Sequence, residues 1–572
     1  MTRGRAGQNR ARAVIAAAVV AVAILVGVRS EAGLGATGAT PPNIVVIMTD
    51  DQTTEQMRVM RHVLADVGQK GVTFDQSFVN YPLCCPSRST FLTGLYAHNH
   101  HVIGNVAPHG GFRRFEALHA NNDLPVWLQG AGYYTTEIGK YLNQYGDRDP
   151  TLIPPGWNDW NAVVGEPRPY DYQLNENGTL TSFGSAPGDY LDDVISGKAV
   201  DFIRGRATQH APFFLYVAYK APHVGGPHLQ GSGCTGHEPE PPVRHYGAFA
   251  NEPLPKPPSF NEADVSDKPT QISSLPPLTD ADIAEITTRY RCELESLLGV
   301  DDGVHRIVNA LKAEGQLTNT LFIYTSDNGF LHGEHRLAIG KSRVYEPSIR
   351  VPLLMRGPGI PRGATSGEMV TNADLAPTIV QAAQATPGLD MDGRSLLDPA
   401  THPNLKRGRR LLNETPTYDA IHTQRFVYVE YDNGEKELYD LRRDPEELQN
   451  VADSQSYSYA QGPLAAELAA LKNCQGGSCR STPSLDLSLN YSSGNGCAKT
   501  PIDADVTGDD SILLDKASFT IGSSRQQVHS APFGVELPPA QLHHHRHNHV
   551  RAVAELVDGR VMTFAANFPP AC

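Results

Sequence analysis

Four short apolar runs, separated by stretches of helical periodicity, constrain the fold of this 572-residue chain more than any other feature. They are residues 43–48 (NIVVIM), 132–140 (GYYTTEIGK), 213–219 (FFLYVAY) and 320–326 (TLFIYTS). Each run has the length and composition of a buried strand. The helical pattern is clearest over 283–315, where it fits one helix or two. Strands that alternate with helices predict an α/β fold with a mixed, largely parallel sheet flanked by helices.

The chain divides into a large unit and several smaller ones. Residues 41–400 contain the α/β pattern, and within them the Gly-, Pro- and charge-rich stretch 224–280 predicts a long surface excursion. Residues 401–472 predict a smaller α+β subdomain, with a hairpin followed by a helix. A Gly/Ser-rich linker is expected at 473–490. Residues 491–572 alternate β-prone runs with turns, which favours a small β-sandwich, with an immunoglobulin-like fold as one option.

The amino terminus has the pattern of an export signal. Four arginines precede the uncharged 16-residue run Ala13–Val28, and small residues follow it. This order predicts a secretory signal peptide over residues 1–38 and a secreted protein. The alternative is an uncleaved membrane anchor, but a spanning helix needs about 20 apolar residues. After cleavage we expect no stable membrane insertion.

Net charge limits the functions that the chain can have, and the cysteines indicate where disulfides can form. A net charge of −14 argues against non-specific nucleic-acid binding as the main role. Export permits disulfides, and a local bridge between Cys474 and Cys479 is expected. Cys292 lies in a helical pattern and is expected to be a buried free thiol. We expect the histidine-rich stretch 543–549 to be a solvated loop rather than a metal site, because its spacing does not match that of a structural metal site.

Polar residues follow each predicted strand. In open α/β sheets, ligands bind outside the carboxyl ends of the strands, so these side chains are expected to meet there. They are Asp50, Asp51, Lys140, His223, Asp327 and Asn328. The carboxylates and the amide oxygen form a hard oxygen-ligand set that suits Ca²⁺, with Mg²⁺ less favoured. Arg88, Lys140 and Lys341 are candidate cations for an anionic group of the substrate.

Two adjacent cysteines, Cys84 and Cys85, precede a proline that suits the first turn of a helix. A helix amino terminus favours negative charge, so a thiol there could be an activated nucleophile. A disulfide or a buried thiol is the other interpretation of the residues alone.

The motif Cys84-Cys85-Pro86-Ser87-Arg88, completed by LTG at 92–94, resembles the C-x-P-S-R signature of type I sulfatases. Three segments are similar in sequence to the N-acetylglucosamine-6-sulfatase and extracellular sulfatase branch of that family. They are CCPSR…LTG.Y.HNHHV, GKYLNQYG (139–146) and PLLMRGPGI (352–360). The resemblance extends over about residues 41–452 and so includes EYDNGEKELYDLRRDPEELQN (430–450). It implies an alkaline-phosphatase-like fold and hydrolysis of a sulfate ester, with a sulfated sugar or glycan favoured and an aryl sulfate also open.

The resemblance also implies a role for each motif residue. Cys84 would be oxidised to Cα-formylglycine by a separate formylglycine-generating enzyme. One hydroxyl of the hydrated aldehyde would attack sulfur, and the second would then expel sulfate. Ca²⁺ would be held by Asp50, Asp51, Asp327 and Asn328, with the modified Cys84 completing the shell. Arg88 would orient the hydrate, Lys140 and Lys341 would bind sulfate oxygens, and His223 would protonate the leaving alkoxide.

The sequence departs from the family at one place. Many sulfatases carry a histidine two residues after the first lysine, where this chain has Leu142, followed by Asn143. The residue that deprotonates the sulfated hydrate is therefore open, with His100, His332 and His335 as candidates.

Two other functions compete with this one. The same superfamily includes phosphoester and phosphonate monoester hydrolases, although the lysine pair favours sulfate. A non-catalytic glycan-binding protein is the third possibility, and the intact metal and lysine set argues against it.

Overall fold

The computed structural model describes residues 41–572 except for 210, 227–228, 235–237, 482–483 and 558–559. The predicted signal segment 1–38 therefore lies outside the described residues. Among the residues that are described, no helix has both the length and the apolar character needed to cross a membrane.

A ten-stranded mixed sheet forms the centre of the fold. Its four middle strands, in the order β9-β1-β8-β4, run parallel and coincide with the four predicted runs. They are β1 (Asn43–Asp50), β4 (Tyr134–Gly139), β8 (Phe213–Pro222) and β9 (Thr320–Ser326). Shorter strands complete the two edges: β11 (Ala364–Ser366), β2 (Val72–Phe74) and β10 (Leu353–Arg356) beside β9, and β5 (Asp159–Val163), β6 (Tyr172–Glu176) and β7 (Thr179–Phe183) beside β4. The prediction of a largely parallel α/β sheet is confirmed.

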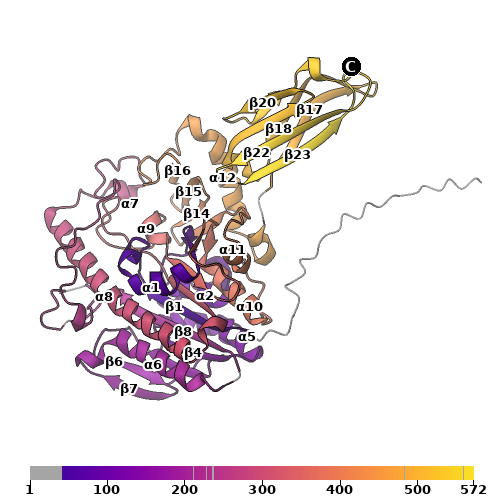
Figure 1. Ribbon diagram of the computed structural model, residues 1–572. Coiled ribbons are helices and arrows are strands. Elements are labelled where there is room, and N and C mark those ends of the chain that lie inside the picture. Colours follow the sequence, from indigo (N-terminus) through magenta and orange to yellow (C-terminus); the bar gives the residue numbers. More distant parts are fainter. Residues whose placement is uncertain (1–40, 210, 227–228, 235–237, 482–483, 558–559) are drawn as a thin grey trace, which may run out of the picture. The chain divides into compact units, whose positions relative to one another are not determined.

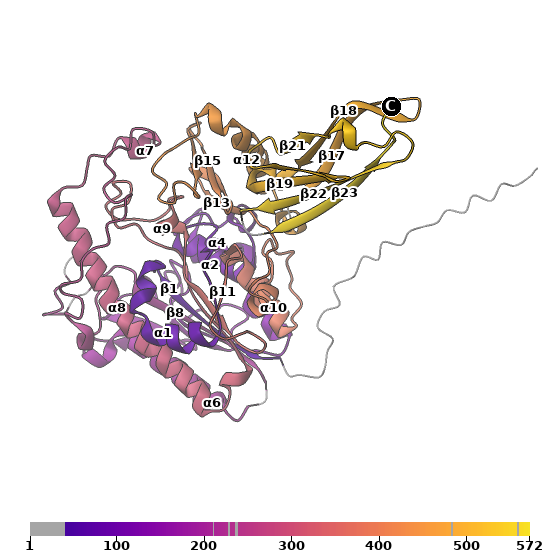
Figure 2. The ribbon, with the colours of Figure 1, turned by 45° about the horizontal axis from the view of Figure 1, so that its top comes forward.

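Helices cover both faces of this sheet (Figures 1 and 2). One face packs against α1 (Arg61–Asp66), α6 (Leu191–Arg206) and α8 (Asp280–Ala313). The other packs against α2 (Cys84–Thr93), α4 (Gly111–His119), α5 (Leu124–Gly130) and α10 (Leu375–Ala383). The pattern that fitted one helix or two is a single helix, α8, which begins with a capping box between Thr279 and Asp282. Shorter helices lie in the connections: α3 (Ala97–His100), α7 (Thr270–Ser273), α9 (Glu346–Ile349) and α11 (Leu397–Thr401).

The carboxyl-terminal third is built from antiparallel sheets. Residues 411–440 form a four-stranded meander, followed by α12 (Ser458–Leu471). The meander strands are β13 (Leu411–Thr415), β14 (Tyr418–His422), β15 (Phe426–Tyr431) and β16 (Lys436–Asp440). Two further sheets follow, with the strand orders β17-β18-β21 and β20-β19-β22-β23. Their strands are β17 (Asp486–Gly494), β18 (Cys497–Thr507), β19 (Leu514–Ile521), β20 (Ser524–Val528), β21 (Gly534–Glu536), β22 (Asn548–Leu556) and β23 (Val561–Phe568). Because β17 begins at Asp486, regular structure starts inside the segment expected as a linker.

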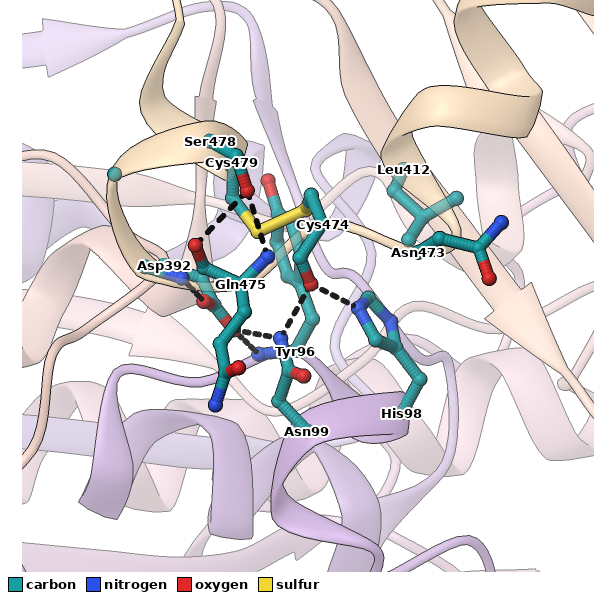
Figure 3. Close-up of a disulfide and its surroundings, with 12 residues drawn as sticks. Tyr96, His98, Asn99, Asp392, Leu412, Asn473, Cys474, Gln475, Ser478 and Cys479 are labelled. Carbon is teal, nitrogen blue, oxygen red and sulfur yellow. Dashed lines mark hydrogen bonds between the residues drawn. A yellow bond between two sulfur atoms is a disulfide. The ribbon is translucent and has the colours of Figure 1, made fainter.

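Three disulfides are present among the described residues. The predicted Cys474–Cys479 bridge is confirmed, and its turn is fixed by hydrogen bonds from His98 and Asn99 to the carbonyl of Cys474 (Figure 3). The prediction that Cys292 is a free thiol is wrong, because it is bonded to Cys234. Helical periodicity shows that Cys292 faces the interior, but it carries no information on a partner 58 residues earlier. The third bridge joins Cys497 to Cys572.

The excursion at 224–280 is more than a surface loop. The Cys234–Cys292 bridge fastens it to α8, and Leu254, Val265 and Ile272 are buried. At these described positions the segment is therefore packed into the fold rather than lying free on its surface.

Candidate active site

The carboxylates meet because β1 and β9 are neighbouring parallel strands that end together, with Thr49 opposite Ser326. Asp50 and Asp51 follow from one strand and Asp327 from the other, and one carboxylate oxygen of each lies within 4.8 Å of the others. Asp51 has a left-handed backbone (φ 68°), which turns the chain sharply at the strand end. All three side chains are buried.

The donor set fits a hard cation. Asn328 donates its Nδ2 to Asp51 Oδ1 at 2.6 Å, whereas its Oδ1 is buried and accepts no hydrogen bond. A buried amide oxygen without a partner is costly, so its presence beside three carboxylates is consistent with a cation ligand. Oxygen donors of this kind suit Ca²⁺ better than a soft metal. Four of the five predicted metal-ligating residues are thus brought together, and the Sγ atom of the fifth, Cys84, lies 3.4 Å from Asp50 Oδ1.

Cys84 and Cys85 are the first two residues of α2 and lie in different surroundings. The Sγ atom of Cys84 is 2.9 Å from Lys341 Nζ and 3.4 Å from Asp50 Oδ1. Cys85 packs in the apolar core against the sheet, and its backbone N–H is bonded to Asn105. Burial is the main cause that raises the pKa of the Cys84 thiol. Neither cysteine is in a disulfide, which excludes that interpretation of the pair.

Arg88 lies one helical turn after Cys84 and is fully enclosed. It donates Nε to Asp327 Oδ2 at 2.8 Å and Nη1 to the carbonyl of Lys140 at 2.7 Å. Its Nη2 is 3.7 Å from Asp50 Oδ2. Arg88 therefore connects the start of α2 to the ends of β9 and β4, which orients the groups around Cys84.

Two lysines balance the negative charge of the Asp50 and Asp51 carboxylates. Lys140, which follows β4, forms an ion pair with Asp50, and Lys341 forms one with Asp51. Burial is the largest single influence on Lys140 and opposes its charge, but the neighbouring acidic groups, Asp50 first among them, together raise the lysine pKa. Burial likewise opposes the charge of Lys341, and Asp51 raises its pKa well above the ordinary value. Both amines stay protonated beside the thiol of Cys84.

His223 reaches the same cluster from β8. Its Nε2 is 3.8 Å from Asp51 Oδ2, and one ring nitrogen lies within 4.8 Å of ligand atoms of Asp50 and Cys84. Burial is the main cause that lowers the pKa of His223. Its loop is shaped by the buried Lys220, whose Nζ donates to the carbonyls of His223 and Val224 at 2.6 and 2.8 Å. Lys220 is not among the site residues predicted from the sequence.

The carboxyl groups of Asp50 and Asp327 have pKa values shifted in opposite directions. Burial alone would raise the pKa of Asp50, but Lys140, His223 and Arg88 together hold it well below its ordinary value. Burial and the neighbouring Asp50 raise the pKa of Asp327 to about 6. A cation shared by the cluster would favour ionisation of both groups.

The three histidines considered for deprotonating the hydrate each have another partner. His100 is bonded to Thr90. His332 contacts Glu293 at 2.6 Å, and His335 contacts Glu262 at 2.7 Å. Leu142, at the position where many sulfatases carry a histidine, lies in the apolar core.

Comparison with known proteins identifies the class to which this fold and site belong. The family model described as Sulfatase matches residues 42–385, and the model described as N-sulphoglucosamine sulphohydrolase, C-terminal, matches residues 333–474. The chain belongs to the sulfatase family of sulfuric ester hydrolases. This agrees with the resemblance carried by the CCPSR motif.

Within that family, the chain is similar to extracellular sulfatases and N-acetylglucosamine-6-sulfatases, at 40% and 32% identity in the two examples that follow. The putative extracellular sulfatase Sulf-1 homolog of Caenorhabditis elegans is 40% identical over 363 residues, covering 62% of this chain but only 48% of that protein. The N-acetylglucosamine-6-sulfatase of Homo sapiens is 32% identical over 509 residues, covering 79% of this chain and 88% of the human protein. The chain thus spans about half of the first relative and most of the second.

Solved structures agree with the fold. A protein in complex with its substrate, D-glucosamine-2-N,6-O-disulfate, is 25% identical with a TM-score of 0.61, over 75% of this chain and 97% of that one. The phosphonate monoester hydrolase of Agrobacterium radiobacter has a TM-score of 0.59 at 22% identity, over 75% of this chain and 95% of that one. The second likeness concerns the fold alone. The fold is alkaline-phosphatase-like, as predicted.

Proposed function

We propose that this chain releases inorganic sulfate from a sulfated sugar or glycan. The observation that carries the proposal is the position of Cys84 at the start of α2, with its Sγ between Lys341 Nζ at 2.9 Å and Asp50 Oδ1 at 3.4 Å. A reacting group at this position faces both the cation site and a fixed positive charge. The substrate-complexed structure and the human relative support a sulfated sugar as the substrate class.

The proposal includes conversion of Cys84 to Cα-formylglycine by a separate generating enzyme. The hydrated aldehyde would supply the hydroxyl that attacks sulfur and a second hydroxyl through which sulfate leaves. An unmodified thiol with a raised pKa is a poor nucleophile, so the burial of Cys84 is consistent with this requirement.

The proposed cation site comprises Asp50, Asp51, Asp327 and Asn328, with the modified Cys84 beside them. Bound Ca²⁺ would polarise a sulfate oxygen and act as a template for the reacting groups. Mg²⁺ is less suitable, because it demands a smaller and more regular shell.

The remaining residues act directly on the ester. Lys140 and Lys341 bind sulfate oxygens and stabilise the charge that moves to the leaving oxygen. Arg88, held by Asp327 and the carbonyl of Lys140, orients the hydrated group. His223 donates a proton to the leaving alkoxide, and Lys220 fixes the loop that carries it.

We also propose that the protein is secreted through the amino-terminal signal. The basic residues, apolar run and small residues of the first 38 positions support this, as does the extracellular sulfatase among the relatives.

Comparing 4-nitrophenyl sulfate with 4-nitrophenyl phosphate and its diesters tests the reaction class on converted enzyme. We expect kcat/KM to be highest for the sulfate ester. A higher value for a phosphate ester or a phosphonate would contradict the proposal. Sulfate release from a panel of sulfated mono- and disaccharides then tests the substrate class separately.

A further inference from the structure

A second cluster of metal-ligating side chains lies between α1 and α8. His62 and Asp66 are four residues apart on α1, and His305 faces them from α8. One ligand atom of each lies within 4.8 Å of the other two. The cluster has no residue in common with the proposed active site.

The two helices hold these side chains in place. Asp301 of α8 accepts hydrogen bonds from the backbone N–H groups of His62 and Val63, at 2.9 and 2.8 Å, so it fixes the start of α1. The imidazole rings of His62 and His305 stack with centroids 4.2 Å apart. His305 Nδ1 is 2.7 Å from Asp66 Oδ2. The ligand atoms thus lie close together, and the ring of His62 needs only to turn out of the stack for its nitrogen to face a cation held by His305 and Asp66.

The outer partner of His305 also suits metal binding. Asn309, one turn further along α8, has its side-chain amide 2.9 Å from His305 Nε2. Amide O and N positions are interchangeable by a flip, so the amide oxygen can accept the Nε2 proton. Such a contact fixes the tautomer in which Nδ1 is the metal ligand, as outer partners do in histidine metal sites.

We propose that His62, Asp66 and His305 form a site for a borderline divalent transition metal, with Zn²⁺ as the best-suited ion. Two imidazoles and one carboxylate match the ligand preference of Zn²⁺, whereas Ca²⁺ prefers the all-oxygen set at the strand ends. Metal binding at Nδ1 displaces the proton that His305 Nδ1 shares with Asp66; one proton is retained by the ring at Nε2, where the flipped amide oxygen of Asn309 accepts it, and any second ring proton passes to solvent. Water completes the coordination shell.

The site joins α1 to α8, so its metal should stabilise this helix pair. A cation that binds the folded state alone raises the midpoint of thermal unfolding in proportion to the logarithm of its concentration over Kd. Because the metal competes with protons for the imidazoles, the effect should weaken as the pH is lowered.

Calorimetric titration with ZnCl₂ tests the proposal on full-length protein saturated with Ca²⁺, so that the strand-end carboxylates are occupied. The control is the exposed histidine-rich stretch 543–549, which could bind Zn²⁺ by itself. We compare wild type with His305→Ala, His62→Ala, Asn309→Ala and a His545→Ala/His547→Ala variant.

We expect one equivalent of Zn²⁺ to be lost in His305→Ala and in His62→Ala and retained in the His545→Ala/His547→Ala variant. Asn309→Ala should weaken this equivalent by about 10- to 100-fold. Zn²⁺ should raise the unfolding temperature of wild type but not that of His305→Ala. Unchanged Zn²⁺ binding in both single-histidine variants, or its loss in the His545→Ala/His547→Ala variant alone, would overturn the proposal. Two single variants are used so that a folding defect in one leaves the other informative.

Discussion

The Cys234–Cys292 disulfide should contribute about twice as much stability as the Cys474–Cys479 disulfide. The first closes a loop with a sequence separation of 58 residues, and the second one of only 5. In the chain-entropy description, a disulfide stabilises the fold by restricting the unfolded chain, and the effect grows with the logarithm of loop length. The two bridges therefore form a matched pair within one molecule.

The loop lengths determine how much each disulfide is expected to contribute to the free energy of unfolding. The entropy relation gives about 4 kcal/mol for the long loop and about 2 kcal/mol for the short one. All four cysteines are at most 5% exposed, so the packing lost on replacement by alanine is similar in both pairs. If residues 41–572 unfold as one unit, the unfolding entropy is about 1.1 kcal/mol per kelvin, and Tm falls by about 4 °C and 2 °C respectively.

Scanning calorimetry without reductant on the two double-alanine variants measures this difference. Labelling the unfolded wild type with a maleimide should modify Cys85, together with Cys84 only in molecules whose Cys84 has not been converted to the aldehyde, because the other six cysteines are bonded. Equal Tm shifts in the two variants would refute the loop-length argument. Labelling of Cys292 in unreduced protein would refute the disulfide itself.

Three further predictions concern the site and its surroundings. Replacing His223 by alanine should slow esters with poor leaving groups by about 10²- to 10⁴-fold and nitrophenyl sulfate much less, and an unchanged dependence on leaving-group pKa would exclude it as the acid. Chelation with EGTA should abolish turnover and added Ca²⁺ should restore it, whereas activity that persists in EGTA would contradict the oxygen-ligand site. Burial opposes the charge of His98, but its hydrogen bond to Glu414 raises the pKa of the imidazole to about 9. This stabilisation is full below the unfolded pKa of about 6.5 and is lost as the pH rises through the folded value, so the Tm difference between wild type and His98→Ala should shrink from about pH 6 to pH 10.

Local sequence patterns were sufficient to predict the four middle strands of the central sheet, but not its six edge strands. The runs at 43–48 and 320–326 are apolar on both faces, and such runs between helical patterns have few alternatives to buried parallel strands. Contacts between residues far apart in the sequence, such as disulfide partners, could not be predicted from local patterns. Nothing in the pattern around Cys292 distinguishes a buried thiol from a bridge to Cys234, because that contact depends on the path of residues 224–280.

The candidate site was predicted to a greater extent than the disulfides, for a topological reason. Parallel strands deliver their carboxyl ends to one edge, so Asp50 and Asp327 had to meet once β1 and β9 were neighbours. The role of Lys220 could not be anticipated, because its hydrogen bonds to the carbonyls of His223 and Val224 depend on how the loop folds back. The identity of the group derived from Cys84 rests on chemistry added after translation, which residue spacing alone does not encode.

Mass spectrometry of the peptide that contains Cys84 and Cys85, made on enzyme from a host with the generating enzyme, tests the central claim most directly. The account predicts a loss of about 18 Da located at Cys84, the mark of a thiol converted to an aldehyde. The fraction converted should equal the fraction of molecules active on nitrophenyl sulfate, and Cys84→Ala should be inactive while Cys85→Ala retains most activity. A fully active enzyme with an unmodified thiol at Cys84 would contradict the account.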